Sequence, residues 1–122
     1  MRVLVVDGAN VVGSRPTGWW RDRPGAAARL HEDIARSDLD HDLVVLVLEG
    51  AARRGRPAGR VGTVLTVHAA GSGDDAIVDE ARARSRDGDE VVVVTADRGL
   101  RARVAAAGGT CVGPSWLLDR TG

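Results

Sequence analysis

The residues of this sequence that are best suited to chemistry are carboxylates placed at the ends of short apolar runs. They are Asp7, Glu49, Asp74 with Asp75, and Asp97. Carboxylates that gather at one place repel one another, and hard cations that prefer oxygen ligands relieve that repulsion. If the apolar runs are neighbouring strands, the acids therefore predict a site for one or two Mg²⁺ or Mn²⁺ ions.

Such a site suits phosphodiester hydrolysis. Two ions roughly 3.5–4 Å apart can activate water and stabilise the leaving oxygen without a nucleophilic side chain. The sequence offers no convincing Ser-His-Asp or Cys-His set, and His31, His41 and His68 share no spacing typical of metal ligands. We interpret these histidines as surface residues or residues with satisfied hydrogen bonds.

The elements that must position the acids alternate along the chain. β-branched apolar runs predict strands buried on both faces at residues 3–6, 43–48, 61–67, 91–94 and 110–112. Apolar spacing predicts helices at residues 24–37, 74–86 and 98–107, and a last turn at 115–119. This order predicts one domain over residues 1–122, an α/β fold with a central, mostly parallel five-stranded sheet in a three-layer α/β/α sandwich.

In an open parallel sheet, ligands bind beyond the carboxyl ends of the strands, where the predicted acids would meet. Each acid also has a purely structural interpretation. Asp74 and Asp75 follow Ser72-Gly73 and would favour a helix N-terminus, Asp97 would cap the next helix, and Asp7 would belong to a polar turn. Their coincidence on one sheet edge favours a functional site.

Composition limits the classes of protein. The 17 basic and 17 acidic residues cancel, so any site for a polyanion must be local. The single cysteine, Cys111, indicates a buried thiol and no disulfide-linked partner. Residues 3–6 are too few for a signal peptide or a membrane span. We therefore expect a cytoplasmic protein without a membrane partner.

Arginines and tryptophans cluster in two segments that could hold a substrate. Residues 49–60 carry Arg53, Arg54, Arg56 and Arg60 among glycines and a proline, which predicts a mobile loop whose charges contact phosphates or are merely solvated. Arg15 lies in a second segment with Trp19 and Trp20, which would stack unpaired bases, pack the loop onto its helix or form a homodimer contact.

Three short motifs together resemble those of NYN domains in the PIN-like nuclease superfamily. They are Val5-Val6-Asp7-Gly8-Ala9-Asn10-Val11, Gly73-Asp74-Asp75-Ala76-Ile77-Val78 and Val94-Thr95-Ala96-Asp97-Arg98-Gly99. The resemblance implies a sheet ordered 3-2-1-4-5 and cleavage of RNA to products with 5′-phosphate ends. It also implies that Asp7, Asp74, Asp75 and Asp97 bind metal as catalytic residues and that Asn10 orders the site.

The sequence departs from the family in one place, because many relatives carry a further acid where Arg98 and its neighbours stand. That departure supports an alternative function, a catalytically silent PIN-like module that binds RNA or protein. A toxin neutralised by an antitoxin is a second alternative. Other nucleotide and phosphate folds are excluded: the chain has no lysine for a receiver domain, no phosphatase aspartate at Ala9, and neither a Gly-x-Gly-x-x-Gly nor a P-loop motif.

Overall fold

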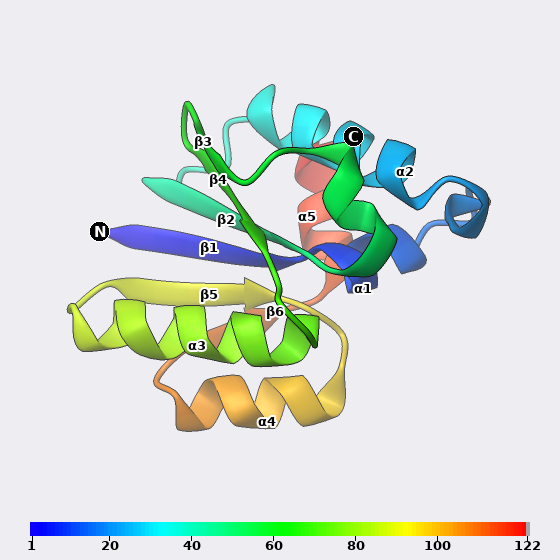
Figure 1. Cartoon of the computed structure of the whole chain (residues 1–122). Helices are drawn as coiled ribbons and strands as arrows, with labels where there is room; N and C mark the ends of the chain where they lie inside the picture. Colours follow the sequence, from blue (N-terminus) through cyan, green and yellow to red (C-terminus); the bar gives the residue numbers. More distant parts are fainter. Residues whose placement is uncertain (122) are drawn as a thin grey trace.

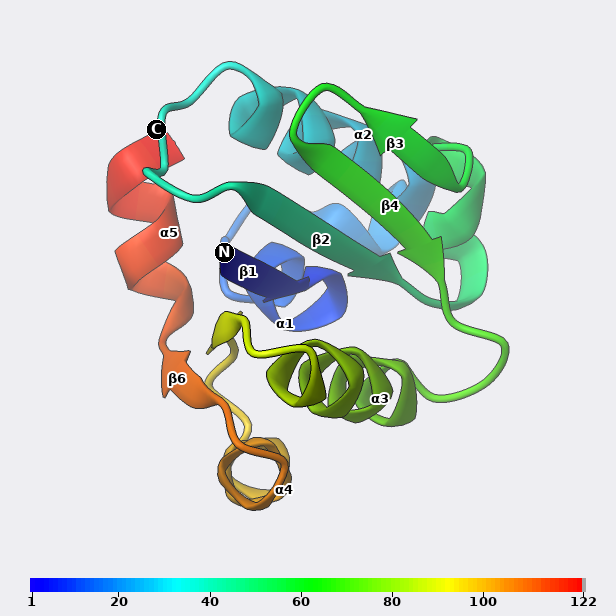
Figure 2. The ribbon, with the colours of Figure 1, turned by 90° about the vertical axis from the view of Figure 1, so that its left-hand side faces the viewer.

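The computed structural model describes residues 1–121 and contains one six-stranded sheet in the order β3-β4-β2-β1-β5-β6 (Figures 1 and 2). All neighbours pair in parallel except β3 with β4. The strands are β1 (Arg2–Asp7), β2 (Leu43–Leu48), β3 (Gly59–Val61), β4 (Val64–His68), β5 (Glu90–Val94) and β6 (Thr110–Val112).

Helices cover both faces of the sheet, which confirms the expected α/β sandwich (Figure 1). Alternate residues of β1 point to opposite faces, so Val3 and Val5 pack with one buried cluster and Leu4 and Val6 with the other. The first cluster takes its helical residues from α3 (Gly73–Arg86) and α4 (Arg98–Ala106). The second takes them from α1 (Gly8–Gly13), α2 (Arg23–Ala35) and α5 (Pro114–Thr121).

The structure corrects two expectations about the middle of the chain. Residues 61–67 do not form a single strand, because the left-handed backbone of Gly62 (φ +59°) makes a tight turn between β3 and β4. The other five strands stand in the expected order. Residues 49–60 are not a mobile loop: Gly50–Gly55 forms the 3-10 helix η2, which packs so closely on α2 that a Cβ at Gly55 would clash with the Pro24 carbonyl.

Helix α1 was not expected from the sequence, which suggested a polar turn after Asp7. The Asp7 side chain caps this helix by accepting a hydrogen bond from the Asn10 amide, and Val11 is buried in the core. Gly8 lets the chain turn against β2, since a Cβ there would lie 2.6 Å from the Val47 carbonyl oxygen. Within residues 1–121, no helix combines the length and apolar character that a membrane crossing requires.

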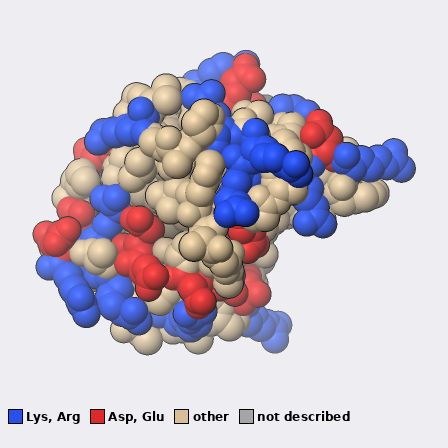
Figure 3. Space-filling view, viewed as in Figure 1, with Lys and Arg blue, Asp and Glu red and all other residues tan. Residues whose placement is uncertain are grey.

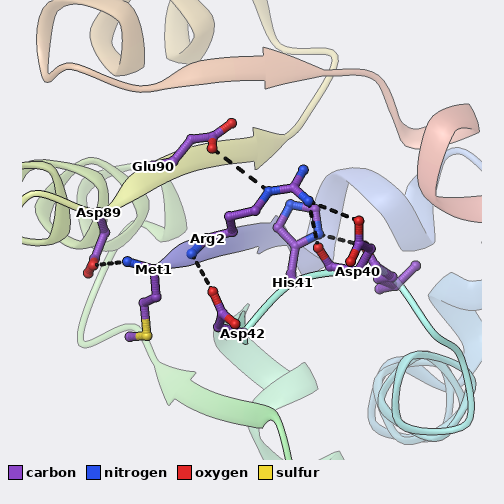
Figure 4. A network of polar contacts seen from close by, with 8 residues as sticks. Met1, Arg2, Asp40, His41, Asp42, Asp89 and Glu90 are labelled. Atoms are coloured by element: carbon purple, nitrogen blue, oxygen red, sulfur yellow. Dashed lines mark hydrogen bonds and ion pairs between the residues drawn. The ribbon is translucent and has the colours of Figure 1, made fainter.

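Ion pairs surround the N-terminal end of β1, on the sheet edge opposite Asp7 (Figure 4). The Met1 amine lies 3.0 Å from Asp89, and the Arg2 guanidinium lies 3.0 Å from Asp40 and 3.8 Å from Glu90. The hydrogen bond and charge of Asp89 raise the pKa of the Met1 amine. These exposed pairs neutralise acids at this edge while adding little stability each.

His31 is a buried histidine on α2, with 4% of its surface exposed. Its Nε2 has no hydrogen-bond partner among the described residues. Burial lowers the pKa of His31 below its ordinary value of 6.5, and the charge of Arg56 lowers it further. Between the lowered pKa and 6.5 the unfolded chain binds more protons than the folded protein, so stability falls as pH drops through that window.

We predict that His31→Leu removes this pH dependence. The free energy of unfolding of the variant should exceed that of wild type by more at pH 5.5 than at pH 7.5. Only wild type must keep His31 neutral in the folded state. Urea denaturation at the two pH values measures the difference. An equal difference at both pH values would show that His31 titrates normally in the folded protein.

Candidate active site

Strand register places Asp7 at the centre of the acidic edge. Asp7 ends β1 opposite Val47 of β2, and Val6 pairs with Val94 of β5, so Thr95 comes next beside Asp7. Asp7 is 7% exposed. Its Oδ2 accepts a hydrogen bond of 2.9 Å from the Thr95 hydroxyl, and its Oδ1 accepts one of 3.2 Å from the Asn10 amide. The carboxylate is therefore held in one orientation.

Thr95 and Asn10 connect Asp7 to the segment that carries Asp97. The Thr95 hydroxyl oxygen accepts a hydrogen bond of 3.2 Å from the Asp97 amide, and Asn10 Oδ1 accepts one of 2.8 Å from the Ala96 amide. The Asp97 side chain also caps α4 by accepting from the Leu100 amide at 2.8 Å. Asp7, Asn10 and Asp97 thus belong to one hydrogen-bonded network, in which Asn10 bonds to Asp7 through its backbone amide and to Ala96 through its side chain.

Glu49 and Asp74 border the same edge from β2 and α3. Glu49 follows β2, and its Oε2 accepts a hydrogen bond of 2.7 Å from the Gly73 amide at the start of α3. Gly73 allows this close approach, because a Cβ there would lie 3.0 Å from the Glu49 carboxylate. Ser72, rather than an aspartate, caps α3 by accepting from the Asp74 amide. Asp74 is therefore not required as the helix cap.

The four carboxylates Asp7, Glu49, Asp74 and Asp97 are called the acidic cluster below, and the pKa values of two of them, Asp7 and Asp74, are raised. Burial raises the pKa of Asp7, its hydrogen bonds from Thr95 and Asn10 oppose that shift, and the charges of Asp74 and Glu49 add to it. Burial also raises the pKa of Asp74, as do the charges of Asp97 and Glu49. The cluster is thus electrostatically unfavourable when all its members are ionised.

Asp75 lies outside the acidic cluster. Its side chain is 69% exposed and forms an ion pair of 2.8 Å with Arg103 of α4. The resemblance gave Asp75 the same metal-binding role as Asp74, and that role stays a prediction; Asp75 is the more exposed of the two, and its charge and that of Arg103 both act on Asp74. Asp79, one turn further along α3, is exposed and lies 3.9 Å from Arg82.

The donor set of the acidic cluster fits a hard divalent cation, because it consists of carboxylate oxygens whose repulsion the charge of Arg103 only partly offsets at Asp74. The side chains do not yet enclose a common point: among residues 1–121, Asp, Glu, His and Cys form no group of three placed to hold a metal ion. Mg²⁺ usually keeps several waters and needs only one or two carboxylates, so the arrangement suits a partly hydrated ion.

The arginines expected to bind substrate fall into two groups. Arg53 and Arg54 line an open hollow of about 640 Å³ with Gly50, Ala51 and His68, directly after Glu49. Arg53 is fixed by hydrogen bonds to the Gly50 and Ala69 carbonyls. Figure 3 shows basic side chains gathered over η2 next to acidic ones. This group places positive charge beside the acidic cluster.

Two of the other three arginines, Arg15 and Arg56, have contacts within the fold. Arg15 lies 3.5 Å from Asp33 of α2 in an ion pair. The Arg56 backbone carbonyl is hydrogen-bonded to the His68 ring at 2.7 Å, and the Arg56 charge acts on buried His31. Their placement offers less support for phosphate binding than that of Arg53 and Arg54.

The sequence did not single out Thr95 as a functional residue, although its hydroxyl links two of the predicted acids. A signal was present: Thr95 is the first polar residue after the apolar run of β5 and lies two positions before Asp97. Glu49 lies outside the three motifs, and in the structure it bonds to Gly73 and its charge acts on Asp7.

Comparison with solved structures identifies the fold. The chain superposes on a crystal structure of Rae1 (YacP) from Bacillus subtilis, in a point-mutant form, with a TM-score of 0.70 and 22% sequence identity. The chain shares the fold of Rae1. The match covers 96% of this chain and 72% of Rae1, and the shared architecture agrees with the expected PIN-like fold. No protein-family model and no curated protein matches the sequence.

We predict that Asp7→Asn stabilises the protein in chelator. Asparagine keeps the helix cap of α1 and removes a buried charge that Asp74 and Glu49 repel. The free energy of unfolding at pH 7 should rise by on the order of 1 kcal/mol.

The gain should shrink toward pH 4. Because the pKa of Asp7 is raised in the folded protein, protonated Asp7 leaves wild type more stable at low pH. Wild type loses that stability as pH rises through the folded-state pKa of Asp7. Urea denaturation at pH 4 and pH 7 measures both effects. Asp75→Asn is the matched control, since Asp75 is exposed. A less stable Asp7→Asn variant would contradict the repulsion and assign Asp7 a structural role.

Proposed function

We propose that this protein is a Mg²⁺- or Mn²⁺-dependent ribonuclease that hydrolyses RNA phosphodiester bonds at the acidic cluster. The observation that carries the proposal is a hydrogen-bonded, mutually repelling set of carboxylates at the carboxyl edge of a parallel sheet. The PIN-like fold shared with Rae1 and the three motifs that resemble NYN domains support a nuclease.

Each part of the site has a role in this proposal. Asp7, Asp74 and Asp97 would hold the cation, with Glu49 at the border of the site. A bound divalent cation supplies activation of water and charge neutralisation at the phosphate. Thr95 and Asn10 keep Asp7 and the residues before Asp97 in place through their hydrogen bonds. Arg53 and Arg54 would neutralise phosphates beside the cut, a contact that carries no sequence preference.

A silent RNA-binding module is the second candidate. It is favoured by Arg98, which stands at the position of a further acid in many relatives. The two functions differ in whether the acidic cluster binds a cation at all.

We predict that millimolar Mn²⁺ or Mg²⁺ raises the thermal stability of wild type relative to chelator. A cation that binds only the folded protein at ten times its Kd adds about 1.4 kcal/mol, which corresponds to a shift of a few degrees in Tm. Asp7→Asn and Asp97→Asn should abolish the shift and keep the fold, since asparagine caps helices as well as aspartate. The absence of a shift in wild type would favour the silent module.

Cleavage of single-stranded RNA should depend on the same residues. We expect Asp7→Asn and Asp97→Asn to lower the cleavage rate by on the order of 100-fold or more, because each removes a charge that holds the cation. Asp75→Asn should retain most activity, since its carboxylate faces Arg103. Gel assays with 5′-labelled RNA measure the rates. A strong loss in Asp75→Asn alone would place the cation elsewhere on α3.

Arg54→Gln should weaken RNA binding equally for unrelated sequences. The loss of one phosphate contact should reduce the salt dependence, the slope of log K against log salt, by about one unit. Arg86→Gln, at the far end of α3, is the control of equal charge change. Fluorescence anisotropy at several salt concentrations gives both slopes. Equal slopes for the two variants would exclude a specific phosphate contact at Arg54.

A further inference from the structure

A cavity of about 470 Å³ lies between α1, the beginning of α2 and η2. Apolar side chains such as Val12, Leu48 and Ala52 form much of its wall. Trp19 and Arg23, whose side chains carry polar groups, also line it. The volume lies within the range of roughly 300–1,000 Å³ that is usual for small-ligand sites. The cavity, called the Trp19 cavity below, is large enough for one planar heterocycle and too small for a duplex.

The Trp19 cavity adjoins the acidic cluster. Gly8, which lines the cavity, directly follows Asp7 in the chain. Glu49 also lines it, and the same carboxylate accepts a hydrogen bond from Gly73 at the start of α3. A ligand group that lies outside the cavity but is bonded to the part inside it would therefore lie toward Asp7.

The two neighbouring tryptophans have different positions. Trp19 lines the cavity, and the Arg23 guanidinium carbon lies 5.3 Å from its ring centroid. Trp20 is 57% exposed and meets Trp19 edge-on, with an angle of 88° between the ring planes. Only Trp19 therefore offers an aromatic surface to a ligand in the cavity, and Trp20 is a natural control for it.

Resting on the ribonuclease activity proposed above, we infer that the Trp19 cavity receives one unpaired nucleobase, from the nucleotide next to the phosphate at the acidic cluster. A base has the planar aromatic surface that stacks on an indole. Arg23 places positive charge beside the stacked ring, where the RNA backbone must pass. A base in a duplex would first have to leave its stack, so the cavity selects single-stranded RNA.

The test uses the full chain carrying Asp7→Asn, so that RNA is not cut, in millimolar Mg²⁺. Anisotropy measures binding of a labelled single-stranded oligoribonucleotide and of a series in which one abasic nucleotide is moved along it. The abasic nucleotide should weaken binding about 5- to 150-fold at one position, the range that corresponds to one stacked base. Trp19→Leu should cause a similar loss with intact RNA and remove the sensitivity to that position. Trp20→Leu should stay within about twofold of its parent.

Two further variants separate stacking from folding. Trp19→Phe keeps an aromatic ring and should recover most of the affinity. Ala52→Leu narrows the cavity from the side of η2 and should remove the abasic sensitivity while Trp19 remains. Thermal unfolding identifies any variant that does not fold. If Trp19→Leu does not fold, the binding measurements on Ala52→Leu decide the test instead.

The outcomes distinguish the cavity from the activity. If wild type cleaves RNA and Trp19→Leu binds RNA as its parent does, the inference about the Trp19 cavity is wrong and the ribonuclease stands. If binding shows the single sensitive position but wild type never cleaves RNA, the cavity is a base site on a silent module. If neither wild type nor any variant binds RNA, both the base site in the Trp19 cavity and the proposed ribonuclease activity are wrong.

Discussion

The parallel register of β1 with its two neighbours is the constraint on which the candidate site depends. Asp7 of β1 lies opposite Val47 of β2, so Glu49 follows two residues after that pair. Val6 lies opposite Val94 of β5, so the next residue, Thr95, reaches Asp7 with its hydroxyl. A shift by one residue would send the Asp7 side chain to the other face of the sheet. Both faces of β1 are packed with valine and leucine, so the apolar pattern alone does not exclude a slip, and the hydrogen bonds of Asp7 with Thr95 and Asn10 favour this register.

Capping and chemistry use the same carboxylates in this protein. Asp7 caps α1 and Asp97 caps α4, so each carboxylate is held in place at a helix N-terminus, and the hydrogen bonds from Asn10 and Thr95 favour the ionised form of Asp7. Burial and neighbouring acids act in the opposite direction on Asp7. The structural and functional interpretations of these acids are therefore compatible, because a cap fixes the orientation that a metal ligand needs.

The sequence predicted features that arise from local patterns and missed those that depend on distant partners. Five parallel strands and their helices follow from β-branched runs and apolar spacing, and the ends of parallel strands brought the acids to one edge. The turn at Gly62 was missed because valines and a leucine surround it on both sides. The pairing of Asp75 with Arg103 joins residues 28 positions apart, a contact that no local pattern encodes.

Hairpin β3–β4 and strand β6 form the two outer edges of the sheet, where a strand of another molecule would have to pair. Each edge strand has three residues, and β3 begins at a glycine with positive φ and carries Arg60, whose guanidinium donates to the Gly62 carbonyl. Such short edge strands, one of them carrying an arginine, resist pairing with a strand from another chain. The long β-branched strands, which would otherwise promote aggregation, are enclosed between them. Association of two copies would accordingly join helical surfaces and leave the sheet discontinuous.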